Sequence, residues 1–370
     1  MKKLYLVVLC CLVVVALITI GSTTPFFGLA NPSESIKIGA IFPLSGDMAY
    51  IGKSNLNAFN LALEDFKKEN DLSVDLIIED SQMSSSVAAT AVNKLIYIDG
   101  VDVVVTNLAP IVSAVTPITS KEQIVTFLTS VVSSSFAIDY NFTYKYYPDV
   151  IDFADVIIGD LNKKNITSVG LMIYNLEPGD GFIAAFEENY AGKMLSVERF
   201  DISTKEFKSN VLKNKDLNVG AYIFIGWPQS EAEVLNEMLQ LGYKIPTYFM
   251  LANYPVVNTG AKDALKYVAP ISTWYTFSEN NSKEFVNHYY EKYGEKPDAE
   301  AAYSYDTMSI ILQVISECGK DKNCIDEKMT STAFNTLIDP KLRFDKYGNA
   351  ILPSALIQYD ASIMAWKTIG

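Results

Sequence analysis

The fold is decided by the stretch Ile36–Phe59, whose sequence is IKIGAIFPLSGDMAYIGKSNLNAF. Its apolar start predicts a buried strand, its glycines predict a turn, and the apolar residues that follow at helical spacing predict a helix. The part Gly46–Ser54 is similar to a phosphate-binding P-loop, but five residues rather than four separate its glycines, and Asp47 puts a carboxylate where phosphate would bind. We therefore expect Gly46 and Gly52 to be turn and helix-start residues rather than parts of a nucleotide site.

Expected strands and helices alternate through most of the chain. The first series of βα units spans residues 36–130, and a second series starts at Val150 and continues to Ala252. The strands are continuous apolar runs, which are typical of parallel sheets covered by helices on both faces, so two Rossmann-like lobes are expected. Helices are expected over 55–68, 112–120, 181–190, 231–240, 282–293 and 298–318. The last two need a sheet to cover, so the chain should return to the first lobe before two final strands.

The N-terminus has the features of an export signal. Two lysines precede an uncharged apolar run from Leu4 to Ile20, and no further charge appears until Glu34. Gly28 and Ala30 provide small residues at the −3 and −1 positions of a cleavage site. The apolar run has 17 residues, which is short for a membrane span. Residues 1–30 are therefore expected to be either a cleaved signal peptide or a retained N-terminal membrane anchor, and the rest of the chain is expected outside the cytoplasm.

Composition and motifs argue against nucleic-acid binding and against catalysis. The net charge of −13 provides no basic patch that could release counterions from a nucleic acid. The sequence has no GxGxxG, GxSxG or HExxH motif, and its single histidine, His288, lies in a stretch with the pattern of a solvated helix. We therefore expect a protein that is not an enzyme and that binds no metal and no cofactor.

Export has two further consequences for single residues. Cys318 and Cys324 are separated by five residues, and outside the cytoplasm they are expected to form a disulfide that closes a helix–loop–helix corner. Asn141, Asn165 and Asn280 each begin an N-x-S/T sequon. These three are glycosylation acceptors where the organism has the machinery, although chance alone produces such sequons in a chain rich in Asn.

Four segments carry a resemblance to a known family. They are IKIGAIFPLSG with GKSNLNAFNLALEDF, then LIIEDSQMSSSVAATAVNKLIYIDGVDVVV, YEKYGEKPDAEAAYSYDTMSIILQVI and LRFDKYGNA. In this order, behind an export signal, they resemble type I periplasmic binding proteins of the leucine/isoleucine/valine-binding class, the substrate-binding components of branched-chain amino acid ABC transporters. The resemblance covers residues 36–368, which is nearly the whole exported chain.

The resemblance implies an α/β fold in which two Rossmann-like lobes with parallel sheets are joined by a three-segment hinge. It implies lobe 1 at 36–147 plus 276–344, lobe 2 at 148–275 plus 345–370, and crossings near 147–149, 273–278 and 344–348. Closure of such a hinge traps a ligand between the lobes. The implied protein is a noncatalytic monomer that binds a small-molecule ligand without a cofactor and delivers it to an ABC permease in the membrane.

The same resemblance bears on the ligand. Relatives that bind α-amino acids hold the carboxylate with a Ser after the third strand and a Thr after the fourth, and hold the ammonium with an acid in the second lobe. These positions fall here at Pro110, Val132 and Asn253, although a slip of one residue would bring Ser133 to the second. Pro110 has neither a hydroxyl nor an N–H, and Asn253 offers a dipole where a countercharge is needed. We therefore expect a small polar or amphipathic solute that is not a plain zwitterion.

The loop after the first strand is expected to line the ligand cleft, with Gly46 allowing close backbone approach, while Lys53 and Ser54 are expected on the helix surface. Trp227 could stack on a planar ligand or belong to the core. The candidate ligand-binding residues are Ser45, Gly46, Ile51, Ala109, Pro110, Thr129, Ser130, Val131, Val132, Pro178, Trp227, Asn253 and Phe277. Two alternatives stay open: an ordinary branched-chain amino acid binder, and an anchored ligand-sensing ectodomain without a permease.

Overall fold

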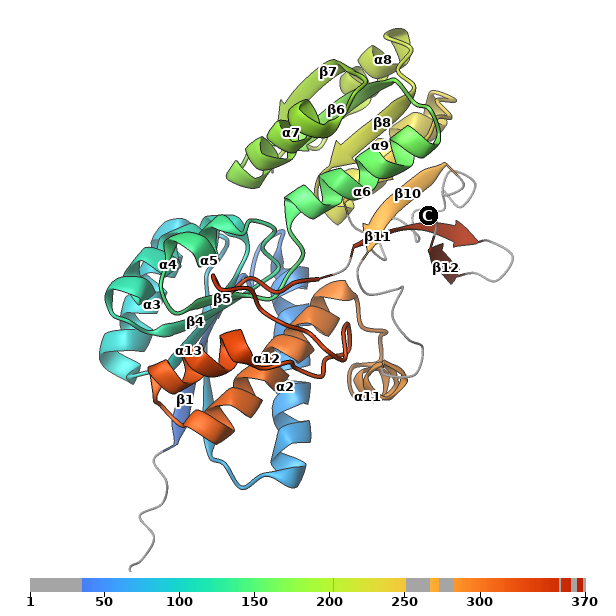
Figure 1. Cartoon of the computed structure of the whole chain (residues 1–370). Helices are drawn as coiled ribbons and strands as arrows, with labels where there is room; N and C mark the ends of the chain where they lie inside the picture. Colours follow the sequence, from blue (N-terminus) through green and yellow to red (C-terminus); the bar gives the residue numbers. More distant parts are fainter. Residues whose placement is uncertain are drawn as a thin grey trace, which may run out of the picture. The chain divides into compact units, whose positions relative to one another are not determined.

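The structure, a computed structural model, describes residues 35–201, 203–250, 267–272, 282–352, 354–360 and 365–368 (Figure 1). Two sheets with flanking helices confirm the predicted α/β architecture. The N-terminal segment 1–30 lies outside the described residues, as do the predicted site residues Asn253 and Phe277 and the sequon residue Asn280. Within the described part of the chain, no helix has the length and apolar character that crossing a membrane requires.

The first sheet is entirely parallel and has the strand order β2-β1-β3-β4-β5. Its strands are β1 (Ile36–Phe42), β2 (Val74–Asp80), β3 (Val103–Asn107), β4 (Val125–Thr129) and β5 (Thr143–Lys145). The chain leaves β1 toward β2 on one side and continues at β3 on the other side, so the order reverses between β1 and β3. Ligands of open α/β sheets bind at such a switch point, outside the carboxyl ends of the strands.

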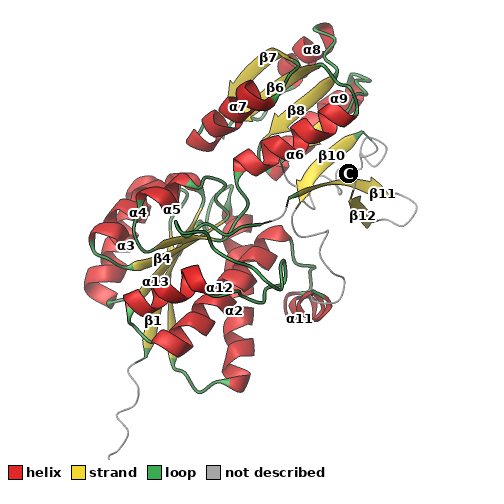
Figure 2. Ribbon diagram, viewed as in Figure 1, coloured by secondary structure: helices red, strands yellow, loops and turns green. Residues whose placement is uncertain are grey.

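Helices cover both faces of the first sheet (Figure 2). Ile38 of β1 belongs to the same buried cluster as Phe59, whereas Ile41 belongs to a second cluster with Ala88 and Ile111, so the two faces of β1 have separate cores. α2 (Ala49–Glu69) and α12 (Ala299–Cys318) pack together on one face, and α3 (Ser85–Lys94) and α4 (Ala109–Lys121) pack together on the other. The return of the chain to the first sheet is thereby confirmed. The remaining helices here are η1 (Leu95–Asp99), α5 (Ser135–Asp139), α11 (Lys283–Tyr293) and α13 (Lys322–Ser331).

The second sheet has the strand order β12-β11-β10-β9-β8-β6-β7. Its strands are β6 (Ser168–Tyr174), β7 (Lys193–Phe200), β8 (Ala221–Ile225), β9 (Thr247–Phe249), β10 (Val268–Ser272), β11 (Ala355–Asp360) and β12 (Ala365–Thr368). The sheet is parallel from β7 to β10, and the last two strands join it antiparallel. Its helices are α6 (Val150–Lys163), α7 (Glu177–Asn189), α8 (Lys208–Asp216) and α9 (Pro228–Gln240), of which α6 packs on α7 and α8 on α9.

Several helices begin earlier than the sequence pattern predicts. α4, α7 and α9 each carry a proline in the first turn. The missing N–H of proline is not needed at this point of a helix and its fixed φ favours helical geometry, so these prolines initiate the helices instead of delimiting them. α2 also begins early, at Ala49, which places Gly52 inside the helix rather than at its start and corrects the prediction.

Gly52 and Ser54 have structural roles in α2. A Cβ at Gly52 would lie 2.0 Å from the carbonyl oxygen of Pro43, so the helix passes the preceding loop at a distance that only glycine permits. The prediction that Lys53 and Ser54 both lie on the helix surface is wrong for Ser54, because this residue is buried and its hydroxyl donates to Asp298. Lys53 is exposed as expected.

The disulfide and two of the three sequons that were expected from export lie among the described residues. Cys318 and Cys324 form a disulfide that joins the end of α12 to α13, with a Cα–Cα distance of 5.5 Å. The helix–loop–helix corner is therefore closed as predicted. Asn141 and Asn165 are exposed, which leaves both sequons accessible, and their glycosylation stays a prediction.

Replacing Gly52 with Ala is expected to destabilise the protein by about 1–3 kcal/mol, because the new methyl group must push α2 away from the Pro43 carbonyl. Gly159→Ala is the matched control. Gly159 lies exposed in α6, and a Cβ added there would meet no atom within 4 Å, so the same change should stabilise the helix by about 0.5–1 kcal/mol. Urea unfolding of the two variants measures both values, and equal effects at the two positions would contradict the close-contact explanation.

Candidate ligand-binding site

A pocket lies where the loops that follow parallel strands come together. From the first sheet, Leu108 and Ala109 follow β3, the segment Ser130–Val132 follows β4, and Tyr50 and Ile51 lie in the first turn of α2. From the second sheet, loops after β6, β8 and β9 contribute. The described lining residues are Tyr50, Ile51, Leu108, Ala109, Ser130, Val131, Val132, Tyr147, Tyr174, Leu176, Pro178, Trp227, Met250 and Glu300. The pocket is partly open, and the volume inside it that water can occupy is about 30 Å³.

Two of the lining loops have an uncommon backbone conformation. Leu108 has a φ of 58° and Ser130 has a φ of 53°, although neither residue is glycine. A positive φ is costly for a bulky side chain such as leucine and persists only where the surrounding structure imposes it. Both residues directly precede or begin the segment that lines the pocket. The strain therefore falls at the ends of β3 and β4 that line the pocket, and strained backbone is often found at functional sites.

Aromatic rings form much of the pocket wall. Tyr50, Tyr147, Tyr174 and Trp227 all line it, and the rings of Tyr174 and Trp227 stack with their centroids 5.6 Å apart. Trp227 also packs against the core cluster that contains Ile111, so it belongs to the core as well as to the pocket lining, and its stacking on a ligand stays a prediction. Its indole Nε1 is buried without a hydrogen-bond acceptor among the described residues. The wall is thus largely aromatic, and the indole N–H of Trp227 is a donor that no described residue uses.

The polar centre of the pocket is the carboxyl group of Glu300, in the first turn of α12. Glu300 is 5 % exposed and accepts hydrogen bonds from the hydroxyl of Ser130 and, at 2.7 Å, from the hydroxyl of Tyr147. Burial, together with the nearby negative charge of Asp298, raises the pKa of Glu300 to about 7, and the two hydroxyl donors only partly oppose this shift. The described lining residues include no Lys, Arg or His. The pocket therefore holds an acid without a compensating cation.

A buried polar network fixes this centre from below. Asn107, at the end of β3, donates to Asn55 of α2 at 2.7 Å, and Asn55 donates to Ser304 of α12 at 2.6 Å. The amide of Asn55 also lies 3.4 Å from the hydroxyl of Ser130. These contacts join β3, β4, α2 and α12 directly beneath the pocket, so the position of Glu300 is set by packing and hydrogen bonding together.

Most of the predicted site residues that the structure describes line this pocket. They are Ile51, Ala109, Ser130, Val131, Val132, Pro178 and Trp227. Pro110 follows Ala109 in α4 without lining the pocket, Thr129 is buried at the end of β4, and Ser45 and Gly46 are exposed. Whether any of these residues binds a ligand stays a prediction.

The sequence analysis missed seven lining residues, namely Tyr50, Leu108, Tyr147, Tyr174, Leu176, Met250 and Glu300. Five of them lie within two residues of a predicted position or a predicted strand end, so a wider window around each strand end would have included them. Tyr147 was expected in a hinge crossing rather than in the site. Glu300 lies near neither a predicted site residue nor a predicted strand end. Glu300 lies far from the other lining segments in sequence and reaches the pocket only through the packing of α12 on α2.

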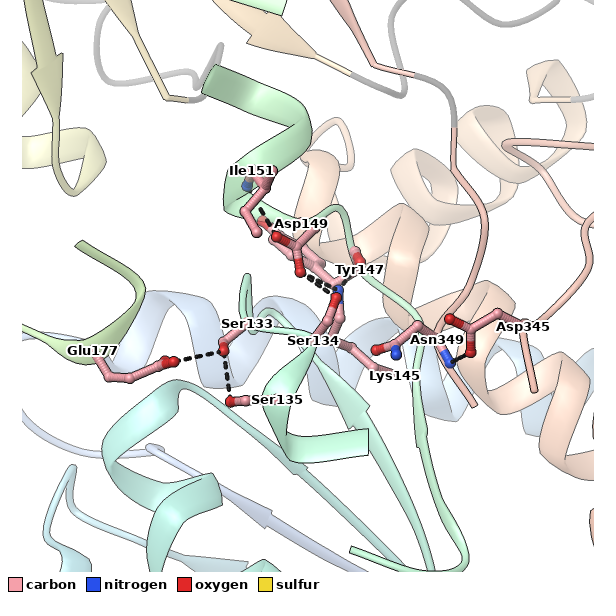
Figure 3. Close-up of polar contacts among 10 residues, drawn as sticks. All are labelled: Ser133, Ser134, Ser135, Lys145, Tyr147, Asp149, Ile151, Glu177, Asp345 and Asn349. Carbon is pink, nitrogen blue, oxygen red and sulfur yellow. Dashed lines mark hydrogen bonds and ion pairs between the residues drawn. The ribbon is translucent and has the colours of Figure 1, made fainter. Parts of the chain in front are cut away.

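A second polar cluster lies beside the pocket (Figure 3). Lys145 is 1 % exposed, and its Nζ donates to the carbonyl oxygen of Tyr147 at 2.6 Å and lies 4.0 Å from a carboxylate oxygen of Asp149. Burial lowers the pKa of Lys145, while the charges of Asp149, Asp152 and Asp345 act in the opposite direction. This buried cation is therefore matched by acids of the chain itself.

Two of the three predicted crossing segments lie side by side at this cluster. The amide of Lys145 donates to the carbonyl of Gly348, and the amide of Ala350 donates to the carbonyl of Lys145, each at 2.8 Å. Nearby, Ser133 bonds to Glu177 of α7 at 3.2 Å, as Figure 3 shows. The second crossing, near 273–278, lies outside the described residues. The lobe boundaries and the hinge itself stay predictions.

The titration of Glu300 predicts a pH-dependent stability. Because the folded protein holds this proton to about pH 7 while the unfolded chain releases it near its ordinary pKa of 4.5, the free energy of unfolding should fall as pH rises between these values. Glu300→Gln cannot titrate. Relative to the wild type it should therefore gain up to about 3 kcal/mol between pH 5 and pH 8.

Urea unfolding of both proteins at the two pH values measures this difference. Burial also raises the pKa of Asp306 to about 7, so Asp306 makes the unfolding free energy fall with pH in both proteins. The pH dependence of stability should therefore be smaller in Glu300→Gln than in the wild type, but not absent. Unfolding free energies of the two proteins that stay parallel from pH 5 to pH 8 would contradict the raised pKa of Glu300.

Comparisons with known proteins place this fold in a family. The sequence profile of the family described as periplasmic binding protein matches residues 35–362. A curated relative, the Leu/Ile/Val-binding protein homolog 7 of Brucella suis biovar 1 (strain 1330), is 21 % identical over 362 residues, which cover 89 % of this chain and 90 % of that protein.

Solved structures agree at the level of the fold. LivJ, the branched-chain amino acid transporter substrate-binding protein of Streptococcus pneumoniae, in complex with isoleucine, has a TM-score of 0.82 at 18 % identity, over 91 % of this chain and 99 % of LivJ. A solute-binding protein of an R. palustris ABC transporter, in complex with benzoate, has a TM-score of 0.82 at 14 % identity, over 91 % of this chain and 96 % of that chain. With its sequence matched over most of its length and its fold shared, this chain belongs to the periplasmic binding protein family.

Proposed function

We propose that this protein is an extracytoplasmic solute-binding protein that captures a small polar or amphipathic solute and delivers it to an ABC permease. The observation that carries the proposal is the single pocket lining drawn from strand-end loops of both sheets, with Ala109 and Ser130 from the first and Pro178 and Trp227 from the second. Solute-binding proteins of this family close two lobes around a ligand at such a place. Membership of the family and the export signal support the extracytoplasmic location and the permease partner.

The start of α4 supports a ligand other than a plain zwitterion. A helix start commonly binds a carboxylate through its free N–H groups. Here Pro110 has no N–H, and the amides of Ile111 and Val112 both donate to the carbonyl of Leu108 at 3.0 Å. This leaves the amide of Ala109 as the first-turn donor nearest the pocket, which is a weak anchor for a carboxylate.

The solutes bound by the compared structures differ from what this pocket favours. Isoleucine and benzoate, which are present in the LivJ and R. palustris complexes, both carry a carboxylate. In this protein the described lining has one acid, Glu300, and no cationic side chain. A ligand carboxylate beside Glu300 would add a second negative charge to a buried site, which is unfavourable without a countercharge. The proposal therefore retains the family's transport role and assigns a different solute class.

A thermal-shift screen of the purified protein tests the proposed function. The panel contains the twenty amino acids, amides, amines, short carboxylates, nucleobases and small peptides. A ligand at 100 times its Kd adds about 2.7 kcal/mol to the stability of the folded state, which should raise Tm by about 5–10 °C. We expect at least one small solute to do so and to be recovered chemically unchanged. A strong response to leucine, isoleucine or valine would restore the ordinary amino acid function, and turnover of the ligand would contradict a noncatalytic binder.

Trp227→Ala is expected to weaken binding of that solute at least about tenfold, because the variant removes an aromatic wall of the pocket. Tyr97→Ala is the matched control, since Tyr97 is 62 % exposed and does not line the pocket. Isothermal titration calorimetry of both variants measures the two Kd values. Similar losses of affinity in both variants would argue against a ligand at this pocket.

A further inference from the structure

Glu300 is a buried acid for which the described lining residues provide no countercharge. Glu300 is 5 % exposed, and its neighbours among the described residues are the hydroxyls of Ser130 and Tyr147 and the charge of Asp298, which has the same sign. An acid in the first turn of a helix is ordinarily explained by the helix dipole. That explanation suffices for Asp298, which caps α12 by accepting from the amide of Ala301 at 2.8 Å. It does not explain why Glu300 is buried in the pocket wall.

The surroundings of Glu300 have the chemistry of a cation site. Four aromatic residues line the same pocket, namely Tyr50, Tyr147, Tyr174 and Trp227. The face of an aromatic ring attracts an ammonium group, and the attraction is stronger where water is excluded. A carboxylate and several aromatic side chains around one small space are therefore complementary to a positive charge on the ligand.

The same lining disfavours a ligand carboxylate. Among the described lining residues there is no cationic side chain, and Pro110 removes one of the N–H groups at the nearest helix start. The indole Nε1 of Trp227, buried without an acceptor among the described residues, is instead suited to a neutral oxygen such as a hydroxyl or carbonyl.

We propose that the solute is a small organic cation, a primary or quaternary amine without a free carboxylate, whose positive charge lies against Glu300 and the aromatic wall. This proposal rests on the proposed function, which it deepens by naming the solute class. Glu300 acts as the specificity-determining residue. In this arrangement the acid comes from the return helix α12 of the first lobe.

Binding of a cation should depend on pH through Glu300. The groups that face this carboxyl are Ser130 and Tyr147, with Asp298 on its own helix and Tyr303 and Tyr50 nearby. The three tyrosines stay neutral because burial raises their pKa values. With a pKa of about 7 for Glu300, its ionised fraction rises about tenfold from pH 6 to pH 8. Amine affinity should rise by about the same factor, whereas affinity for a neutral ligand should not.

The test is calorimetric titration of the purified protein with solutes that share an isobutyl group and differ in charge. Isopentylamine is the cation, leucine the zwitterion, 4-methylpentanoate the anion and 4-methylpentanamide the neutral member, and choline serves as a quaternary cation. We expect isopentylamine or choline to bind at least tenfold more tightly than the other three. We also expect Glu300→Gln to weaken that binding about thirtyfold or more and to abolish its pH dependence.

The outcomes separate this inference from the proposed function. Preferred binding of leucine, the anion or the amide would overturn the cation assignment while leaving a solute-binding protein. If neither these five probes nor the broader screen gave a response, both the cation assignment and the proposed solute-binding function would be contradicted. If Glu300→Gln does not fold, Glu300→Asp replaces it. The shorter acid should keep the preference for cations but bind them severalfold more weakly. Cation affinity that is unchanged in Glu300→Asp, or cation affinity and pH dependence that both survive in Glu300→Gln, would overturn the role of Glu300.

Discussion

The packing of α12 against α2 is the constraint on which the rest of the site depends. It brings residues more than 240 positions apart into contact, through the hydrogen bonds of Asn55 with Ser304 and of Ser54 with Asp298. Because Asn55 also accepts from Asn107, the same contact holds the end of β3. A buried amide with each of its groups partnered is expensive to displace, since every lost partner leaves a desolvated polar atom. The helix pair is thus fixed in register, and Glu300 is fixed with it.

The sheets and their order of elements were predictable because they follow from local patterns. Continuous apolar runs predicted β1, β6 and β8 within a residue or two, and the family resemblance fixed how they connect. Helix starts were less predictable. Proline at the first turn of α4, α7 and α9 looks in sequence like a helix boundary, although physically it favours initiation. β5, with three residues, is too short to show a period, and β10 contains Pro270, which in sequence argues against a strand.

The site was predictable only where it lies next to a strand end. Ala109, Val131 and Trp227 follow β3, β4 and β8, and parallel sheets bring the residues after their strands to one edge. Glu300 belongs to a different class of residue. Its sequence context is that of a helix start beside a capping Asp298, and nothing local shows that this turn faces the pocket. Only the tertiary contact of α12 with α2 and β4 places it there, so no window of sequence could have supplied it.

Lys145 and Glu300 are both buried near the pocket, but they differ in whether the described residues balance their charge. Lys145 is almost fully buried, yet it bonds to the Tyr147 carbonyl and lies near three acids, so its charge is balanced by the chain itself. Such a group is structural, and the backbone amide and carbonyl of the same residue join the segments that precede α6 and β11. Glu300 is buried to a similar degree, but its partners are two neutral hydroxyls and an acid. A buried carboxyl group is tolerated when its charge is paired or when it takes up a proton. The described residues offer Glu300 no cation, so among them only protonation relieves its burial when no ligand is bound. A bound cation would therefore lower the free-energy cost of burying the Glu300 carboxylate, and a bound anion would raise it.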